Sequence, residues 1–164
     1  MKAIQAAVSR EGKLKGVCNM LKTMIRQPLI ELKLSAPSEL TALRQSAEAL
    51  ARRFSLDVTG VHASLLASEV KGAHFVAADT ALIYASGQNI TTPQLVGLNL
   101  SQPVRWGDTG SGQAVSHLLA LLIPATDGSE AAENLLAQVA KRTQTAAWPL
   151  TGAAARQYVQ TVLN

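Results

Sequence analysis

Few residues of this 164-residue chain have the types and spacing that catalysis or metal binding requires. The three histidines are His62, His74 and His117, and their spacing matches no metal-ligand motif. Ser86 opens a Ser-Gly turn after an apolar run, but no GxSxG pattern surrounds it and no aspartate–histidine pair is placed to activate its hydroxyl. The sequence has no glycine-rich phosphate loop either. We therefore expect no metal and no cofactor, and the Ser86 turn is the first place to look for an active face.

Composition predicts one domain of ordinary size in the cytoplasm. The apolar fraction of 48% is enough for a full hydrophobic core, with Leu, Val and Ala filling it because only 4% of residues are aromatic. The single cysteine, Cys18, excludes an intrachain disulfide and a cysteine-based zinc site, and fits a reducing compartment. The longest apolar run, residues 118–124, is too short to span a bilayer, so we expect no stable membrane insertion.

The basic character of the chain is confined to its N-terminal segment. Residues 1–27 hold six of the 15 lysines and arginines but only one of the 11 acidic residues. Residues 28–164 are close to neutral and show neither a basic face nor stacking aromatics. We therefore expect no nucleic-acid partner.

Residues 1–27 are interpreted as a basic amphipathic leader, separate from a domain over residues 28–164. The apolar residues of 12–26 recur on one helical face and the basic residues lie largely off it; these apolar residues are Leu14, Val17, Leu21, Met24 and Ile25. Pro28 ends the helix. An accessory helix docked on the domain is the favoured interpretation, and a helix for a membrane surface or a partner is the alternative.

The remaining periodicity alternates helices with strands. Strands are expected at 29–34, 74–77, 81–86, 94–100, 114–123 and 146–150, and helices at 38–54, 59–70, 127–142 and from 151 onward. Ser38 is a good N-cap, and the first of these helices places Leu40, Leu43, Ala47, Leu50 and Phe54 on one face. The strand at 114–123 is almost continuously apolar, which predicts a central strand, with His117 as a core histidine. The fold class is α/β, a sandwich of a mixed sheet with helices on both faces.

Five stretches of residues 38–164 resemble one known family. SELTALRQSAEALARRF and VTGVHASLLASEV look like its opening helix pair, the second usually ending in Leu-Leu-X-Arg-Glu. GAHFVAADTALIYASG stands where the family has a glycine-rich loop and a strand ending in Ile-Pro-His-Gly. LVGLNLSQPVRWGD is similar to its Pro-Val-Asp-Trp-Gly-Asp corner, and HLLALLIPATDGSEAAENLLAQVAKRT to its core strand and Leu-Leu-rich helix. The family is the IIA domain of the fructose/mannitol class of the bacterial phosphoenolpyruvate-dependent sugar phosphotransferase system.

The resemblance implies a site at Ser86, and it shows what the chain lacks there. In the family, the histidine before the glycine accepts a phosphoryl group from HPr and passes it to a IIB partner. That position is Ser86 here, the preceding proline is Ala85, and the family's second histidine falls on Ala132. A phosphoimidazole bond is labile enough for relay, whereas a serine phosphate ester is too stable, and Ser86 has no neighbouring base to activate it.

Two functions in this system remain open, and both imply HPr-like and IIB-like partners. The favoured one is a degenerate IIA-like domain, without a phospho-acceptor histidine, that docks partners or regulates them. The alternative is an active phosphocarrier, and hence a phosphotransferase, in which His74 takes the place of the missing histidine. An unrelated α/β binding module is the third interpretation.

Overall fold

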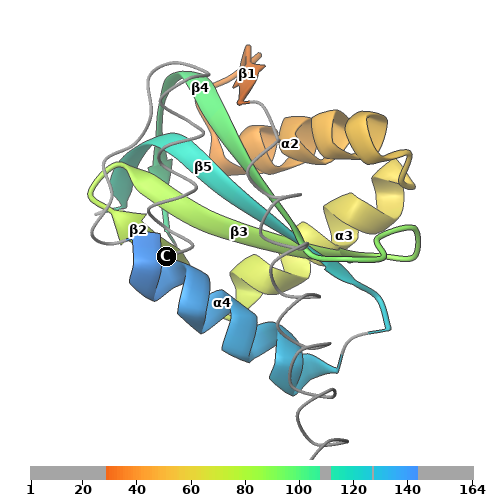
Figure 1. The fold of residues 1–164 in the computed structure, drawn as a ribbon. Coiled ribbons are helices and arrows are strands. Elements are labelled where there is room, and N and C mark those ends of the chain that lie inside the picture. The colour runs from red at the N-terminus through yellow and green to blue at the C-terminus, as the bar shows by residue number, and fades with distance from the viewer. Residues whose placement is uncertain (1–28, 108–111, 127, 144–164) are drawn as a thin grey trace, which may run out of the picture.

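The computed structural model describes residues 29–107, 112–126 and 128–143, which form a five-stranded sheet between helices (Figure 1). In chain order the elements are β1 (Ile30–Leu32), α2 (Glu39–Phe54), α3 (Val58–Val70), β2 (His74–Ala77), β3 (Thr80–Gly87), β4 (Gln94–Trp106), β5 (Gln113–Pro124) and α4 (Ser129–Thr143). The strand order is β1-β4-β5-β3-β2, with parallel pairing in β1/β4 and β3/β5 and antiparallel pairing in the other two pairs. This confirms the predicted α/β fold with a mixed sheet.

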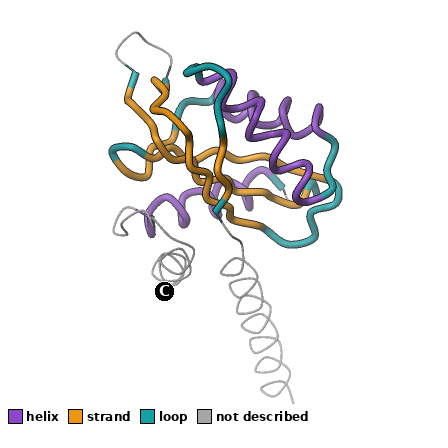
Figure 2. The backbone as a smooth tube through the Cα atoms, turned by 90° about the horizontal axis from the view of Figure 1, so that it is seen from above, coloured by secondary structure: helices purple, strands orange, loops and turns teal. Residues whose placement is uncertain are grey.

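Helices cover both faces of the sheet, α2 and α3 on one side and α4 on the other (Figures 1 and 2). Because side chains alternate along a strand, β5 sends Leu118 and Leu122 toward α2 and α3, and Leu119 and Leu121 toward α4. The strand is buried without interruption from Leu118 to Pro124 and lies in the middle of the sheet. Its apolar sequence therefore predicted a central strand correctly.

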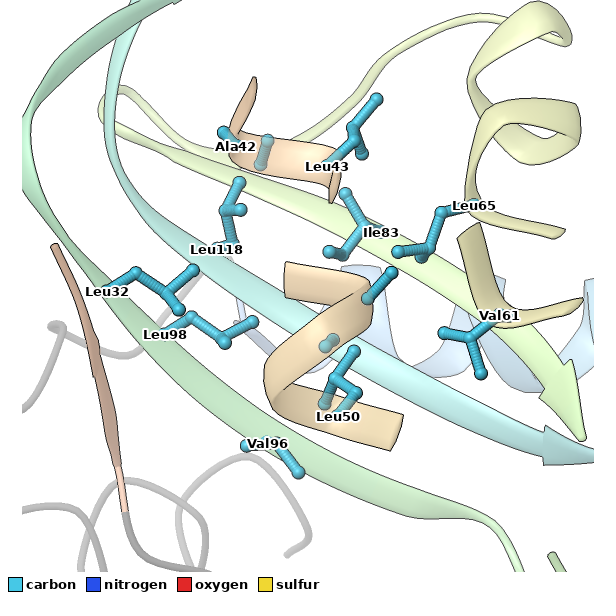
Figure 3. Packing of buried hydrophobic residues seen from close by; sticks show 14 of the residues in the cluster. Leu32, Ala42, Leu43, Leu50, Val61, Leu65, Ile83, Val96, Leu98 and Leu118 are labelled. Atoms are coloured by element: carbon cyan, nitrogen blue, oxygen red, sulfur yellow. The ribbon is translucent and has the colours of Figure 1, made fainter. Parts of the chain in front are cut away.

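The larger core lies between the sheet and the α2–α3 pair (Figure 3). Leu50 of α2, Leu65 of α3, Ile83 of β3 and Leu118 of β5 are fully inaccessible to solvent. Burial of each such side chain stabilises the fold by about 1.5–3 kcal/mol. This core holds α3 against β3, and α3 in turn carries side chains that reach the Ser86 turn.

Both helices of the pair begin at side-chain caps. Ser38 Oγ accepts a hydrogen bond from Thr41 N at 3.1 Å, as the sequence predicted. At the start of α3 Asp57 Oδ2 accepts from Gly60 N at 2.6 Å. Between them Ser55 adopts a left-handed φ of 54°, which reverses the chain within a few residues.

The prediction that Leu40 belongs to the core was wrong. Its side chain is 68% exposed, whereas Leu43, Ala47 and Leu50 are buried. Leu40 lies in the first turn of α2 and lines a surface groove with Leu66 and other residues of α3, beyond the stripe that faces the sheet.

The predicted end of β4 at Leu100 was also wrong, because the strand continues to Trp106. The pairing of β4 with β5 shifts register between Asn99 and Val104, so the ladder is irregular where Pro103 lies. Proline has no N–H to donate and is tolerated at such an irregularity. The strand resumes after it and buries Val104 and Trp106.

The helix predicted at 12–26, the strand at 146–150 and the helix from 151 lie outside the described residues, as does Asp127, the first residue of the helix predicted at 127–142. In the part of the chain that the structure covers, no helix is long and apolar enough to cross a membrane.

Candidate functional site

Ser86 lies at the carboxyl end of β3, next to the carboxyl end of β5. The two strands run parallel, with Ser86 opposite Ile123 and Gly87 opposite Pro124. Ser86 is exposed, and its backbone N–H donates to Ser64 Oγ of α3 at 3.0 Å. Crevices outside the carboxyl ends of parallel strands are the usual ligand sites of open α/β sheets.

The turn after Ser86 is held in one conformation by the carbonyl of Gly87. This oxygen accepts hydrogen bonds from Ile90 N and Ala125 N, each at 3.2 Å. A Cβ on Gly87 would lie 3.2 Å from Ile90 Cγ1 and 3.3 Å from Leu56 Cδ2, closer than side chains normally tolerate. The sequence signal of a Ser-Gly turn therefore corresponds to a rigid feature, with Ser86 at its rim.

Two hollows flank Ser86. The first, of about 310 Å³, extends between the N-terminal part of α3 and the turn, and its lining includes Asp57, Gly60 and Asn89. The second, of about 250 Å³, extends toward α4; it is lined by Ser64, Lys71, Tyr84, Ser86, Ile123, Pro124, Ala125, Ala132 and Glu133. Ser64, Lys71 and Tyr84 were not singled out by their sequence, because only the fold brings α3 and β3 together here.

The structure brings together the two positions at which the resemblance implies histidines. Ser86 and Ala132 line the same second hollow, although they belong to β3 and α4. Ala85 points the other way and is fully buried in the larger core. At the position of the arginine in the Leu-Leu-X-Arg-Glu motif the chain has Ser68, whose hydroxyl is buried and donates to Leu65 O at 2.7 Å. None of these side chains has the nucleophilic nitrogen of an imidazole.

His74 lies outside both hollows. It is half-buried on β2, opposite Leu82, and its ring centroid is 6.3 Å from that of Tyr84. Ser86 is four residues beyond Leu82 along β3, or about 13 Å at the rise of a strand. Tyr84 lines the second hollow and therefore lies between His74 and Ser86.

His117 lies toward the other end of β5, opposite Thr80, and has the contacts expected of a structural histidine. Its Nδ1 is 3.0 Å from Asn99 Oδ1, and its Nε2 is 3.7 Å from Asp79 Oδ2. Partial burial lowers the pKa of His117, against the opposing effect of the Asp79 carboxylate. The prediction of a hydrogen-bonded structural histidine is confirmed, but His117 is only partly buried and lies outside both hydrophobic clusters.

A carboxylate that the sequence did not mark as special links α3 to β4. Glu69 Oε2 accepts a hydrogen bond from Trp106 Nε1 at 3.1 Å, and Glu39 Oε2 accepts from Gly107 N at 3.1 Å. Burial raises the pKa of Glu69 to about 7, the Trp106 hydrogen bond acts in the opposite direction, and the charge of Glu39 raises it further. Glu69 and Trp106 lie near the ends of two of the stretches that carry the family resemblance, so the structure gives those motifs a role in the architecture.

The raised pKa of Glu69 predicts a pH-dependent stability. Between pH 4.5 and about 7 the folded protein keeps a proton that the unfolded chain releases, so the free energy of unfolding falls as pH rises through this window. Glu69→Gln keeps an acceptor for Trp106 and removes the titration. Solvent reaches this half-buried group and reduces the effect. We expect the free energy of unfolding of wild type to fall by about 1 kcal/mol more than that of Glu69→Gln between pH 5 and pH 8.

Urea unfolding of both proteins at the two pH values measures this difference. The lowered pKa of His117 gives a slope of opposite sign, but it is present in both proteins and cancels. Parallel pH profiles for the two proteins would contradict the assignment to Glu69.

Among the described residues, no group of three or more His, Cys, Asp or Glu side chains is placed to hold a metal ion. The site around Ser86 offers hydroxyls, one ammonium and two carboxylates, the side chains of Lys71, Asp57 and Glu133 being the charged ones. Such a set can bind a polar or charged group but has no evident nucleophile with a paired base.

Fold and site together define an α/β sandwich domain with a shallow polar site at the carboxyl ends of two parallel strands. No protein-family model matches the sequence, and no curated protein matches it significantly. Solved structures of the same fold do match, and phosphotransferase-system IIA domains are among them. The nitrogen regulatory protein IIA-Ntr from Neisseria meningitidis aligns with a TM-score of 0.59 and 19% identity, over 79% of this chain and 92% of its own.

Two structures of the mannitol-specific protein give the same result. IIA mannitol from Escherichia coli aligns with a TM-score of 0.54 and 13% identity, over 79% of this chain and 94% of its own. The E. coli complex of enzyme IIA with phosphorylated enzyme IIB for mannitol aligns with a TM-score of 0.54 and 14% identity, over 80% of this chain and 93% of the matched chain. The chain therefore has the fold of these IIA domains, as the resemblance implied.

Proposed function

We propose that this protein is a cytoplasmic IIA-like component of the sugar phosphotransferase system that docks partner proteins and does not relay phosphate. One observation carries the proposal: Ser86 and Ala132 line a formed hollow at the two positions where the resemblance implies histidines. The site keeps its rigid turn and its exposure, so a partner can approach it. Its side chains cannot form the labile phosphoimidazole on which relay depends.

The proposed partners are IIB-like and HPr-like proteins. A mannitol-specific IIA domain of this fold has been solved in complex with phosphorylated IIB, which supports a IIB-like partner for this chain. An HPr-like partner follows from the resemblance. The exposed rim of Ser86, Gln88 and Asn89 at the carboxyl ends of β3 and β5 is the proposed docking surface. Docking without transfer is the expected activity of a regulatory domain.

Relay through His74 is the second candidate, and one contact favours it. The His74 ring lies beside Tyr84, which lines the second hollow. An imidazole that reached the hollow by displacing Tyr84 would supply the missing nitrogen. Relay requires that nitrogen to be held within a few tenths of an ångström of the productive position, which an adjacent strand does not provide.

Incubation of the full chain with phosphoenolpyruvate, enzyme I and HPr distinguishes the two candidates. We expect no acid-labile phosphate on the protein, together with retained binding of HPr or of a IIB domain. Acid-labile label on wild type that disappears in His74→Ala would establish the relay candidate. Matched His62→Ala serves as control, because His62 lies on α3 and lines neither hollow.

A further inference from the structure

We propose that the second hollow binds the phosphoryl group of a partner's phosphohistidine without accepting it, so that the domain distinguishes phosphorylated from unphosphorylated partners. The inference rests on the proposed function and specifies that the site binds the phosphorylated form of the partner. No bond forms or breaks in this step: the phosphoryl group stays on the partner's imidazole nitrogen, and the hollow holds its oxygens.

Hydroxyl groups supply the first part of the recognition. Ser64 Oγ already accepts the backbone N–H of Ser86, which leaves its own O–H to donate. Ser86 and Tyr84, which also carry hydroxyls, line the same hollow. Within the described ranges, no residue accepts a hydrogen bond from any of these three hydroxyls. These three hydroxyls therefore have no acceptor among the described residues and can donate hydrogen bonds to a ligand.

Lys71 supplies the charge. It caps the C-terminal end of α3, is exposed, and is the lysine among the residues that line this hollow. Within the described ranges Lys71 forms no ion pair, so no described carboxylate neutralises its charge. A phosphoryl dianion between an ammonium and hydroxyl donors forms charge-assisted hydrogen bonds, which are about twice as strong as neutral ones.

Size and position also fit such a group. The volume of about 250 Å³ is several times the roughly 30 Å³ that a water molecule occupies, so a phosphoryl group and the edge of its imidazole can enter together. Ala132, Ile123 and Pro124 form an apolar wall on the α4 side, suited to the face of an imidazole ring. Because Ala132 has only a methyl group, it leaves open the space that a larger side chain would fill.

Glu133 is the feature of the hollow that opposes anion binding. Its carboxylate lines the rim on α4 and is exposed. Solvent screens an exposed charge, so Glu133 reduces the preference for a phosphoryl group without cancelling it. The consequence is a measurable one: neutralising Glu133 should strengthen binding of the phosphorylated partner, and neutralising Lys71 should weaken it.

The test measures the affinity of the full chain for HPr and for HPr kept phosphorylated by enzyme I and excess phosphoenolpyruvate. We expect phosphorylated HPr to bind at least about tenfold tighter than HPr, the size of one charge-assisted interaction. Lys71→Gln should remove most of this preference, whereas Lys141→Gln, an exposed lysine of α4 outside the hollow, should keep it. Glu133→Gln should increase the preference about two- to threefold.

Equal affinity for both forms of HPr, with no phosphate transferred, would overturn this inference and leave the docking function standing. Transfer of phosphate to the chain would instead overturn the docking function. The last experiment titrates the protein with inorganic phosphate and follows the amide chemical shifts of Ser64, Ser86 and Ala125. Saturable shifts that Lys71→Gln abolishes support phosphoryl recognition. Such shifts without any preference for phosphorylated HPr would show a site for free phosphate and overturn the partner assignment.

Discussion

Ser86→His is expected to convert the protein into one that takes acid-labile phosphate from phosphorylated HPr. Ser86 is exposed on a turn fixed by two hydrogen bonds to the Gly87 carbonyl, so a longer side chain can be accommodated outward. The imidazole would supply the nucleophilic nitrogen that serine lacks. Label from phosphoenolpyruvate, enzyme I and HPr should rise at least about a hundredfold above wild type, the lower end of what a correctly placed catalytic group contributes.

Gln88→His is the matched control for this experiment. It places an exposed imidazole two residues further along the same turn, beside the first hollow and away from Ala132. We expect no label above wild type, because transfer depends on the position of the nitrogen more than on the presence of a histidine. Equal label on both variants would show non-specific acceptance. An unlabelled Ser86→His protein that still binds HPr would mean that Ser86 does not occupy the acceptor position.

The expected gain separates two properties of the proposed site, the binding of a phosphoryl group and its transfer. Ser64, Tyr84 and Lys71 line one hollow beside the Ser86 position. Hydroxyl and ammonium donors there can hold a phosphoryl group, and the absence of an imidazole prevents its transfer. Binding and transfer are thus separable, and the Ser86 position decides between them.

Sequence patterns predicted the elements whose side chains repeat with a clear period. The helical period of α2 reflects burial of one face against the sheet. The continuous apolar run of β5 reflects burial of both faces of the strand. The continuation of β4 beyond Pro103 was not predictable in this way, since an irregular ladder is set by the partner strand and not by local sequence. The burial of Leu40 was predicted wrongly for a related reason. Helical spacing predicts which face of a helix is buried, but it does not predict how far along the helix the packing against neighbouring elements extends.

The sequence directed attention to the Ser86 turn but did not indicate which side chains surround it, and a functional site there stays a prediction. The Ser86 turn was recognisable from its Ser-Gly sequence after an apolar strand, and the resemblance identified Ala132. Ser64 and Lys71 carry no signal of their own, because their role comes from the packing of α3 against β3. The Glu69–Trp106 hydrogen bond joins residues 37 positions apart, and nothing local to either residue indicates the other.

Trp106→Ala is expected to have the largest effect on stability of any single substitution considered for this chain. Trp106 is fully buried, and truncation of a buried tryptophan costs about 3–5 kcal/mol through lost transfer energy and the cavity left behind. It also removes the donor to Glu69, whose half-buried carboxylate would then lose a partner. The midpoint of urea unfolding, with an unchanged slope, measures this loss.

Trp106→Phe separates packing from the hydrogen bond. It keeps an aromatic ring and removes the indole N–H, and we expect a loss of about 1–3 kcal/mol, larger at pH 8 than at pH 5 because the ionised Glu69 carboxylate then lacks its donor. Combining it with Glu69→Gln should remove the pH dependence of that loss. A Phe variant as stable as wild type at pH 8 would show that the bond carries no net stability.

The consequence of weakening this link reaches the candidate site through α3. Glu69 lies near the C-terminal end of that helix, two residues before Lys71. Ser64 lies on the same helix, less than two turns before Glu69. Because the Glu69–Trp106 bond holds this end of α3 to β4, its loss should alter the positions of Ser64 and Lys71 relative to Ser86. We therefore expect Trp106→Phe to reduce the preference for phosphorylated HPr even where the fold is retained. Trp106 would then influence the candidate site through α3, without contacting it.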